Sequence, residues 1–162
     1  MEREKKIILL SHCIINQNSV VLPLARAKGP FPFVGTIIKN NIGIYQFPCP
    51  ELKFGGLNRK PMPKEKYDTP KYRELCASLS NDIISDLVEY IRNDYKIIGI
   101  IGVKHSPTCS ISEKRGIFME ELFKMLDENN IKIPYIEVSE EYPSSNEAIT
   151  NMENLLSSIL KS

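Results

Sequence analysis

The chain has 162 residues and a nearly balanced charge, with 21 basic and 20 acidic side chains and a formal net charge of +1. Hydrophobic residues make up 42% and charged residues 25%, a composition typical of soluble globular proteins rather than of disordered or membrane proteins. The balance argues against a protein that mainly coats nucleic acid, because such proteins carry a basic excess. The length is that of one domain, so we expect residues 1–162 to form a single unit.

The first apolar run, Ile7 to Leu10, is too short for a signal peptide or a membrane span, and no later segment approaches ~20 apolar residues. We therefore expect a cytoplasmic protein with no membrane partner. Thiols stay reduced in that compartment, so the four cysteines are not read as a disulfide framework. Metal binding, catalysis and buried free thiols remain the alternatives for them.

The hydrophobicity pattern predicts alternating strands and helices. In chain order it predicts a strand at 6–10, a short helix at 33–39, a strand at 42–47, a helix from 70 to about 95, a strand at 96–103, a helix at 116–130, a strand at 133–138 and a helix at 144–160. The proline- and glycine-rich segments 29–32 and 50–69 are predicted to be loops. Thr69 is expected to cap the long helix, and Ser144 with Glu147 to form a capping box at the last one.

This order predicts an α/β fold, a three-layer Rossmann-like or flavodoxin-like domain. Its four-stranded, mostly parallel sheet should be covered by helices on both faces. Ligands of such sheets bind outside the carboxyl ends of the strands. Residues that follow the strands are therefore the first candidates for a functional site.

Three cysteines follow the first three predicted strands, namely Cys13, Cys49 and Cys109. If the strands are parallel, these thiols emerge at one edge of the sheet, although their placement could also be a coincidence. No two of these cysteines form a C-x-x-C pair, which argues against zinc-ribbon and ferredoxin patterns. Three thiolates without a fourth indicate an open coordination position, and their softness favours iron–sulfur, zinc or cuprous ions. Cys76 lies inside the predicted long helix and is expected to be a packed thiol.

Oxygen-bearing side chains accompany these cysteines. Ser11 precedes Cys13 in "SHC", Glu51 follows Cys49 in "CPE", and Ser106 precedes Cys109 in "SPTC". Prolines stiffen the second and third of these segments.

Other features near the strand ends have two interpretations. His12, Lys104 and His105 could face a ligand, or could make structural hydrogen bonds and point to solvent. Gly55 and Gly56 are expected to form a turn, and the basic run "NRKPMPKEK" to be a solvated surface. Neither a Walker sequence nor G-x-G-x-x-G occurs, so a nucleotide-phosphate loop has no support.

Taken together, "LLSHC", "CPELKFGGL" and "VKHSPTC" resemble motifs of the small TudS-type desulfidases, the 2-thiouracil desulfidases and their relatives. The order and rough spacing match across about the first 110 residues. This resemblance implies an enzyme of sulfur metabolism with a 4Fe–4S cluster on three cysteines. Its open iron takes the sulfur of a thiolated pyrimidine, and water supplies the replacing oxygen without net redox change.

Carried over to this chain, the resemblance implies Cys13, Cys49 and Cys109 as metal ligands. Glu51 and Ser106 are then expected to be catalytic, while Ser11, His12 and Lys104 are expected to bind the substrate. The chain departs from the family pattern in "HCIINQN" and "TCSIS", which alters the pocket wall and puts the substrate in question more than the cluster.

The residue types fit this chemistry without the family name, because a soft leaving sulfur suits a thiolate-held iron and the attacking water needs a base such as Glu51. Two alternatives stay open. The cysteines could hold zinc or a cluster for a structural or sensory role, or Cys13 beside His12 could be a nucleophile. Adjacent residues on a strand-like segment point apart, which argues against the last of these.

Overall fold

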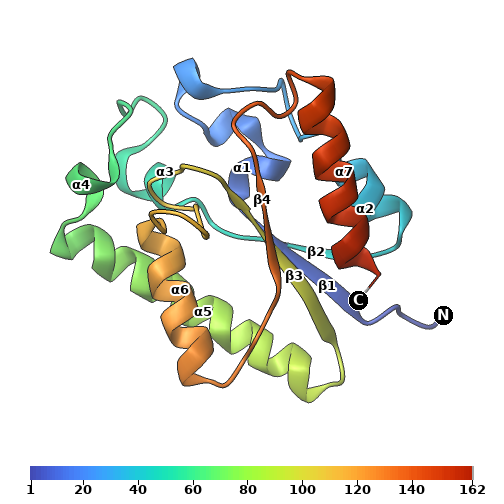
Figure 1. Ribbon diagram of the computed structural model, residues 1–162. Helices are drawn as coiled ribbons and strands as arrows, with labels where there is room; N and C mark the ends of the chain where they lie inside the picture. The colour runs from blue at the N-terminus through green and yellow to red at the C-terminus, as the bar shows by residue number, and fades with distance from the viewer. Residues whose placement is uncertain (162) are drawn as a thin grey trace.

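A computed structural model describes residues 1–161 and shows the four predicted strands as one parallel sheet (Figure 1). The strands are β1 (Lys6–Leu10), β2 (Gly43–Gln46), β3 (Lys96–Val103) and β4 (Tyr135–Val138), in the order β2-β1-β3-β4. All three pairings are parallel. The predicted α/β fold is therefore confirmed.

Helices cover both faces of this sheet, which gives the three layers that the sequence predicts. They are α1 (His12–Ile15), α2 (Val34–Lys39), α3 (Pro50–Gly55), α4 (Lys64–Tyr67), α5 (Pro70–Arg92), α6 (Ile117–Glu128) and α7 (Asn146–Leu160), with short 3₁₀ helices η1 (Gln17–Ser19) and η2 (Leu22–Leu24). Helices α5 and α6 lie on one face, while α2 and α7 lie on the other (Figure 1). Within residues 1–161, none of the helices combines the length and the apolar character needed to cross a membrane.

Strand β1 is buried on both faces because alternate side chains enter different cores. Ile7 and Leu9 pack with residues of α5 and α6, whereas Ile8 and Leu10 pack with residues of α2 and α7. The period of two in a strand explains this division. A continuous apolar run is thus needed here, as for any strand covered on both sides.

The prediction of one loop over 50–69 was wrong, because this segment contains α3 and α4. Pro50 takes the first helical position, where its missing amide costs no hydrogen bond. The Cys49 sulfur accepts a hydrogen bond from the Leu52 amide at 3.4 Å and caps this helix. Gly56 then ends the helix with a φ of 75°, in agreement with the turn expected there.

The predicted cap of the long helix is confirmed, since Thr69 accepts a hydrogen bond from the Tyr72 amide at 3.2 Å. The predicted capping box of the last helix, Ser144 with Glu147, was wrong: the cap lies one residue later, and Ala148 stands three residues after it, where a box needs Glu or Gln. Ser145 is the cap and accepts from the Ala148 amide at 3.0 Å. Ser144 instead donates its hydroxyl to the carbonyl of Glu141 at 2.7 Å. Both Ser144 and Ser145 are suitable helix caps by residue type, and the backbone conformation decides which of them takes that position.

Candidate active site at the carboxyl ends of the strands

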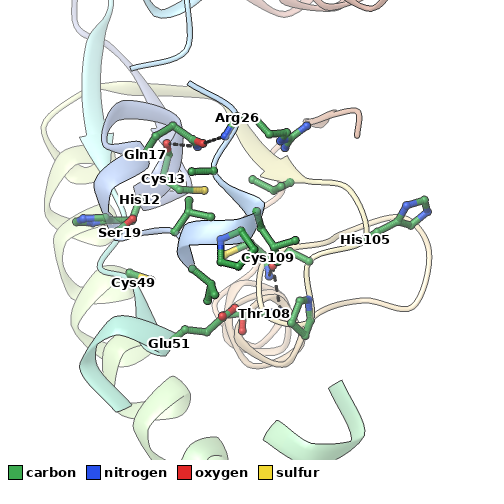
Figure 2. Close-up of a pocket in the computed structure, with 18 of the residues that line it drawn as sticks. His12, Cys13, Gln17, Ser19, Arg26, Cys49, Glu51, His105, Thr108 and Cys109 are labelled. Atoms are coloured by element: carbon green, nitrogen blue, oxygen red, sulfur yellow. Dashed lines mark hydrogen bonds between the residues drawn. The ribbon is translucent and has the colours of Figure 1, made fainter. Parts of the chain in front are cut away.

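The three cysteines that follow strands line one cavity of about 470 Å³ at the carboxyl edge of the sheet. Cys13 lies on α1 directly after β1, Cys49 precedes α3 after β2, and Cys109 lies in the loop after β3. Figure 2 shows their side chains around this cavity, with Glu51 on the same side as Cys49. All three are free thiols. The parallel sheet is what brings together residues so distant in the sequence.

The hydrogen bonds of Gln17 hold the segment around Cys13 in place. The side-chain amide of Gln17 donates to the carbonyl of Cys13 at 2.9 Å, and its oxygen accepts the Arg26 amide at 2.9 Å. Gln17 is itself buried. The helical turn at Cys13 also corrects the expectation of a strand-like segment there, so His12 and Cys13 follow a helical rather than an alternating geometry.

Backbone contacts fix the position of Cys109 closely. The Ser106 hydroxyl oxygen accepts the amides of Thr108 at 3.2 Å and Cys109 at 3.0 Å. The Cys109 carbonyl accepts the Val103 amide at 3.1 Å. Gly116 lies against this loop so tightly that an added Cβ would be 2.2 Å from the carbonyl carbon of Thr108. Ser106 therefore holds the loop, and its hydroxyl proton stays available for a further hydrogen bond.

Burial keeps the three thiols neutral in the absence of a metal. It raises the pKa of Cys13 to about 12, with a further contribution from nearby Cys49. Burial also raises the pKa of Cys49, and it raises that of Cys109 well above the ordinary value. Metal ligation requires thiolates, so a metal that binds here has to displace the protons.

Each cysteine nevertheless has a neighbour that favours its thiolate. The positive charge of Arg26 opposes the rise in the pKa of Cys13, and Arg59 does the same for Cys49. Within the described residues the buried Ser11 hydroxyl makes no hydrogen bond of ordinary geometry, yet it lies close enough to Cys109 to lower the pKa of that thiol. Ser11 thus lies behind Cys109 and is not among the residues that line the cavity.

Glu51 lines the cavity from the first turn of α3. Its Oε1 accepts a hydrogen bond from the Tyr67 hydroxyl at 3.1 Å and lies 3.7 Å from Nε of Arg59. The side chain is 16% exposed. The carboxylate is therefore held by a hydroxyl and a buried cation while it still reaches the cavity.

The other candidate residues, His12 and Lys104 for substrate binding, Ser106 for catalysis and His105 without an assigned role, reach the same cavity in different ways. His12, Lys104 and Ser106 line it. Nδ1 of His12 lies 3.0 Å from the carbonyl oxygen of Phe47, which fixes the ring. His105 is at the rim, where it is exposed and paired with Glu140 at 2.5 Å, and Figure 2 shows it pointing away from the cysteines.

Two arginines of the cavity, the half-buried Arg26 and the buried Arg59, were not predicted from the sequence. Arg26 donates to the carbonyl oxygens of Ser139, Glu140 and Tyr142 at 2.6–2.9 Å. Arg59 lies in the basic run that was expected to be solvated, but its side chain is only 8% exposed. That expectation was wrong for Arg59, since nothing in a row of similar charges marks which one turns inward.

An aliphatic wall also escaped the sequence reasoning. The segment around η1 and η2 contributes five apolar residues to the cavity lining, namely Val20, Val21, Pro23, Leu24 and Ala25. Val103 and Pro107 add apolar surface from the end of β3 and the loop after it. Such surface packs well against a flat organic ring. Cys76, by contrast, is fully buried in the core beside α6, as predicted for a packed thiol.

Comparisons with known proteins agree with the motifs. Residues 33–158 match the family model described as "Putative 2-thiouracil desulfurase", and this match includes Cys49 and Cys109 but not Cys13. An uncharacterized protein of Methanocaldococcus jannaschii is 46% identical over 153 residues, which cover 94% of this chain and 97% of that protein. No solved structure matches the chain.

Proposed function

Because this chain belongs to the family described as "Putative 2-thiouracil desulfurase", we propose that it is an enzyme that removes sulfur from a thiolated pyrimidine or a related thio-compound. The observation that carries the proposal is the meeting of three thiols and one carboxylate in one cavity. The reaction replaces a carbon–sulfur bond with a carbon–oxygen bond from water and releases sulfide, so it needs no oxidant or reductant.

We further propose that Cys13, Cys49 and Cys109 hold a 4Fe–4S cluster. Among residues 1–161, His, Cys, Asp and Glu side chains form no group of three that could hold a single metal ion. In a cluster the cysteines bind different irons, so their sulfurs only have to surround a common space. When bound on three thiolates, such a cluster supplies a soft Lewis acid with an open position, suited to a leaving sulfur.

Glu51 is the proposed base for the attacking water. Its carboxylate reaches the cavity that the cysteines line, and proton transfer by a positioned carboxylate typically contributes 10²–10⁴-fold, an order-of-magnitude estimate. The proton that it takes from water passes to the departing sulfur, which leaves as hydrosulfide. The second proton of the water leaves to solvent when the carbonyl forms, so the reaction balances. Ser106 is positioned to donate its hydroxyl proton to the substrate or to a ligand sulfur, because its oxygen is already occupied by two amides.

The rest of the cavity is proposed to bind and orient a flat, small-molecule substrate. The aliphatic wall excludes water from the ring, while His12 and Lys104 offer polar contacts. Ser11 acts behind Cys109 rather than on the substrate. A cytoplasmic location agrees with four free cysteines, since thiols persist in a reducing compartment.

The decisive experiment reconstitutes the protein anaerobically and screens thiolated pyrimidines for sulfide release. We expect four irons per chain, absorption near about 400 nm and sulfide from at least one compound. Cys49→Ala should lose iron and absorption, whereas Cys76→Ala, a cysteine away from the cavity, should keep both. Stoichiometric zinc would instead indicate a structural site. Iron without sulfide release from any compound would indicate a sensory protein.

A further inference from the structure

We infer that Arg59 is a positioning residue that fixes the Oε1 atom of Glu51 and so leaves Oε2 as the proton acceptor. The inference rests on the proposed function, because it assigns the base to one atom of the same carboxylate. It concerns a residue that no motif singled out.

Arg59 joins two parts of the cavity wall through its terminal nitrogens. One donates to the carbonyl of Gly56, at the end of α3, at 3.0 Å. The other donates to the carbonyl of Ser19, in η1, at 2.8 Å. Both bonds fix the plane of the guanidinium, which has five donors in a rigid fork. The orientation of Nε is therefore determined by the backbone around it.

This Nε is buried and has no hydrogen-bond partner among residues 1–161. A buried donor without a partner destabilises the folded protein, and more so when it belongs to a charged group. Oε1 of Glu51 lies 3.7 Å away, within an ion pair but beyond a hydrogen bond. A small shift of the Glu51 carboxylate toward Arg59 would give this Nε a hydrogen bond. The guanidinium therefore favours positions of Glu51 in which Oε1 stays beside Nε.

The two oxygens of Glu51 consequently differ. Oε1 faces two donors, the hydroxyl of Tyr67 at 3.1 Å and Nε of Arg59. Burial raises the pKa of Tyr67 to about 12, so this hydroxyl keeps its proton at neutral pH and donates it. Oε2 takes part in no hydrogen bond found within residues 1–161. It is the oxygen left for water.

The same contacts connect Glu51, the proposed base, to the aliphatic wall of the cavity. Ser19 immediately precedes the apolar residues from Val20 to Ala25 that line the cavity. Since Arg59 holds Ser19 and contacts Glu51, one side chain sets the distance between the wall and the carboxylate. Lysine has a single terminal nitrogen and cannot reproduce the planar fork.

A double-mutant cycle tests this inference. The chain is compared with Arg59→Met, Glu51→Gln and the double variant, each reconstituted to equal iron content and absorption. We expect Arg59→Met to lower kcat for sulfide release about 30-fold with KM changed less than about threefold. In the Glu51→Gln background the same change should cost less than about twofold, because Arg59 acts through Glu51.

Tyr67→Phe is a second probe of Oε1, and it removes neither of the hydrogen bonds from Arg59 to the carbonyls of Gly56 and Ser19. It should lower kcat in the wild-type background and have little effect in the Glu51→Gln background. Arg73→Met, at an arginine of the ion-pair network around α5, is the matched control and should leave kcat unchanged. If Arg59→Met lowers kcat by the same factor in the wild-type and in the Glu51→Gln background, the inference is overturned.

A cycle on the free energy of unfolding, with the same four proteins, does not depend on turnover. Arg59→Met and Glu51→Gln should be non-additive there as well, since the two side chains interact directly. Additive effects on unfolding overturn the Arg59 inference even if no sulfide is released. A wild-type protein that releases no sulfide from any thio-compound instead contradicts the proposed function.

Discussion

The residue type alone does not decide what a cysteine does in this protein. Cys76 is buried between α5 and α6, where a thiol acts as a small apolar group. Cys49 caps a helix beside a buried arginine and a carboxylate, so its sulfur has polar neighbours on several sides. Neighbouring groups thus distinguish a structural thiol from a candidate ligand.

The carboxylate of Glu51 gives the sharpest prediction at the residue scale. Glu51→Gln keeps the size and one acceptor oxygen but removes the base. We expect normal iron content and absorption, with kcat for sulfide release lowered more than about 100-fold. Steady-state kinetics on the best thiolated substrate measure this. Activity within about tenfold of the wild type, which is ~1.4 kcal/mol of barrier, would remove Glu51 as the base.

At the scale of elements, each candidate ligand depends on the segment that follows its strand. The loop between β3 and α6 returns against the sheet, so the carbonyl of Cys109 accepts the amide of Val103. Gly116, at the start of α6, packs directly on this loop. A side chain at this position has no space, although its backbone φ of −65° is ordinary.

Gly116→Ala should therefore displace the Cys109 loop. An added Cβ would lie 2.2 Å from the carbonyl carbon of Thr108 and 2.6 Å from the amide nitrogen of Cys109. We expect a loss of about 1–3 kcal/mol in the free energy of unfolding, as for other overpacked sites, together with lower iron content. Denaturant unfolding and iron analysis measure both.

Gly35→Ala is the matched control for that experiment. Gly35 is exposed in α2, and an added Cβ there meets no atom of the described part of the chain within 4 Å. Alanine favours a helix over glycine by up to about 1 kcal/mol, so this variant should be neutral or more stable. If Gly116→Ala and Gly35→Ala change the free energy of unfolding and the iron content equally, the contact of Gly116 with Thr108 is not the cause of the loss.

Across the whole molecule, an ion-pair network ties α4, α5 and α6 together on the face of the sheet that these helices cover. Arg73 pairs with Asp68, Glu120 and Glu121, and Lys64 pairs with Glu120. The hydrogen bond from Arg73 lowers the pKa of Asp68. Burial alone would raise the pKa of Glu120, but hydrogen bonds from Lys64 and Arg73 outweigh it and lower that pKa.

This network should make stability depend on acid pH. Carboxyls with a lowered folded pKa stabilise the fold above their ordinary values of 3.8 and 4.5, and this contribution is lost as pH falls below them. Arg73→Met should therefore lower Tm at pH 7 and differ less from the wild type at pH 3. Thermal unfolding at both pH values measures this. A difference in Tm that does not shrink at pH 3 would contradict the role of these pairs.

Much of the architecture was predictable because local patterns reflect burial directly. The bounds of β1 and β3 match the prediction, since both strands lie in the middle of the sheet and are apolar after the lysine that begins each of them. The shorter β2 and β4 lie at its edges, where fewer residues pair. Helices α3 and α4 were not predicted, because proline and glycine signal loops as often as helix ends.

The sequence by itself determined the alternation of strands and helices, and hence the edge at which Cys13, Cys49 and Cys109 meet. Parallel strands direct all their carboxyl ends to one side, so this result needs no long-range information beyond the pattern. Only the tertiary structure decided that Arg59 turns inward to Glu51 and that η1 and η2 form the cavity wall. The physical reason is that a buried charge is stabilised by partners distant in sequence, here the carbonyls of Ser19 and Gly56 and the carboxylate of Glu51.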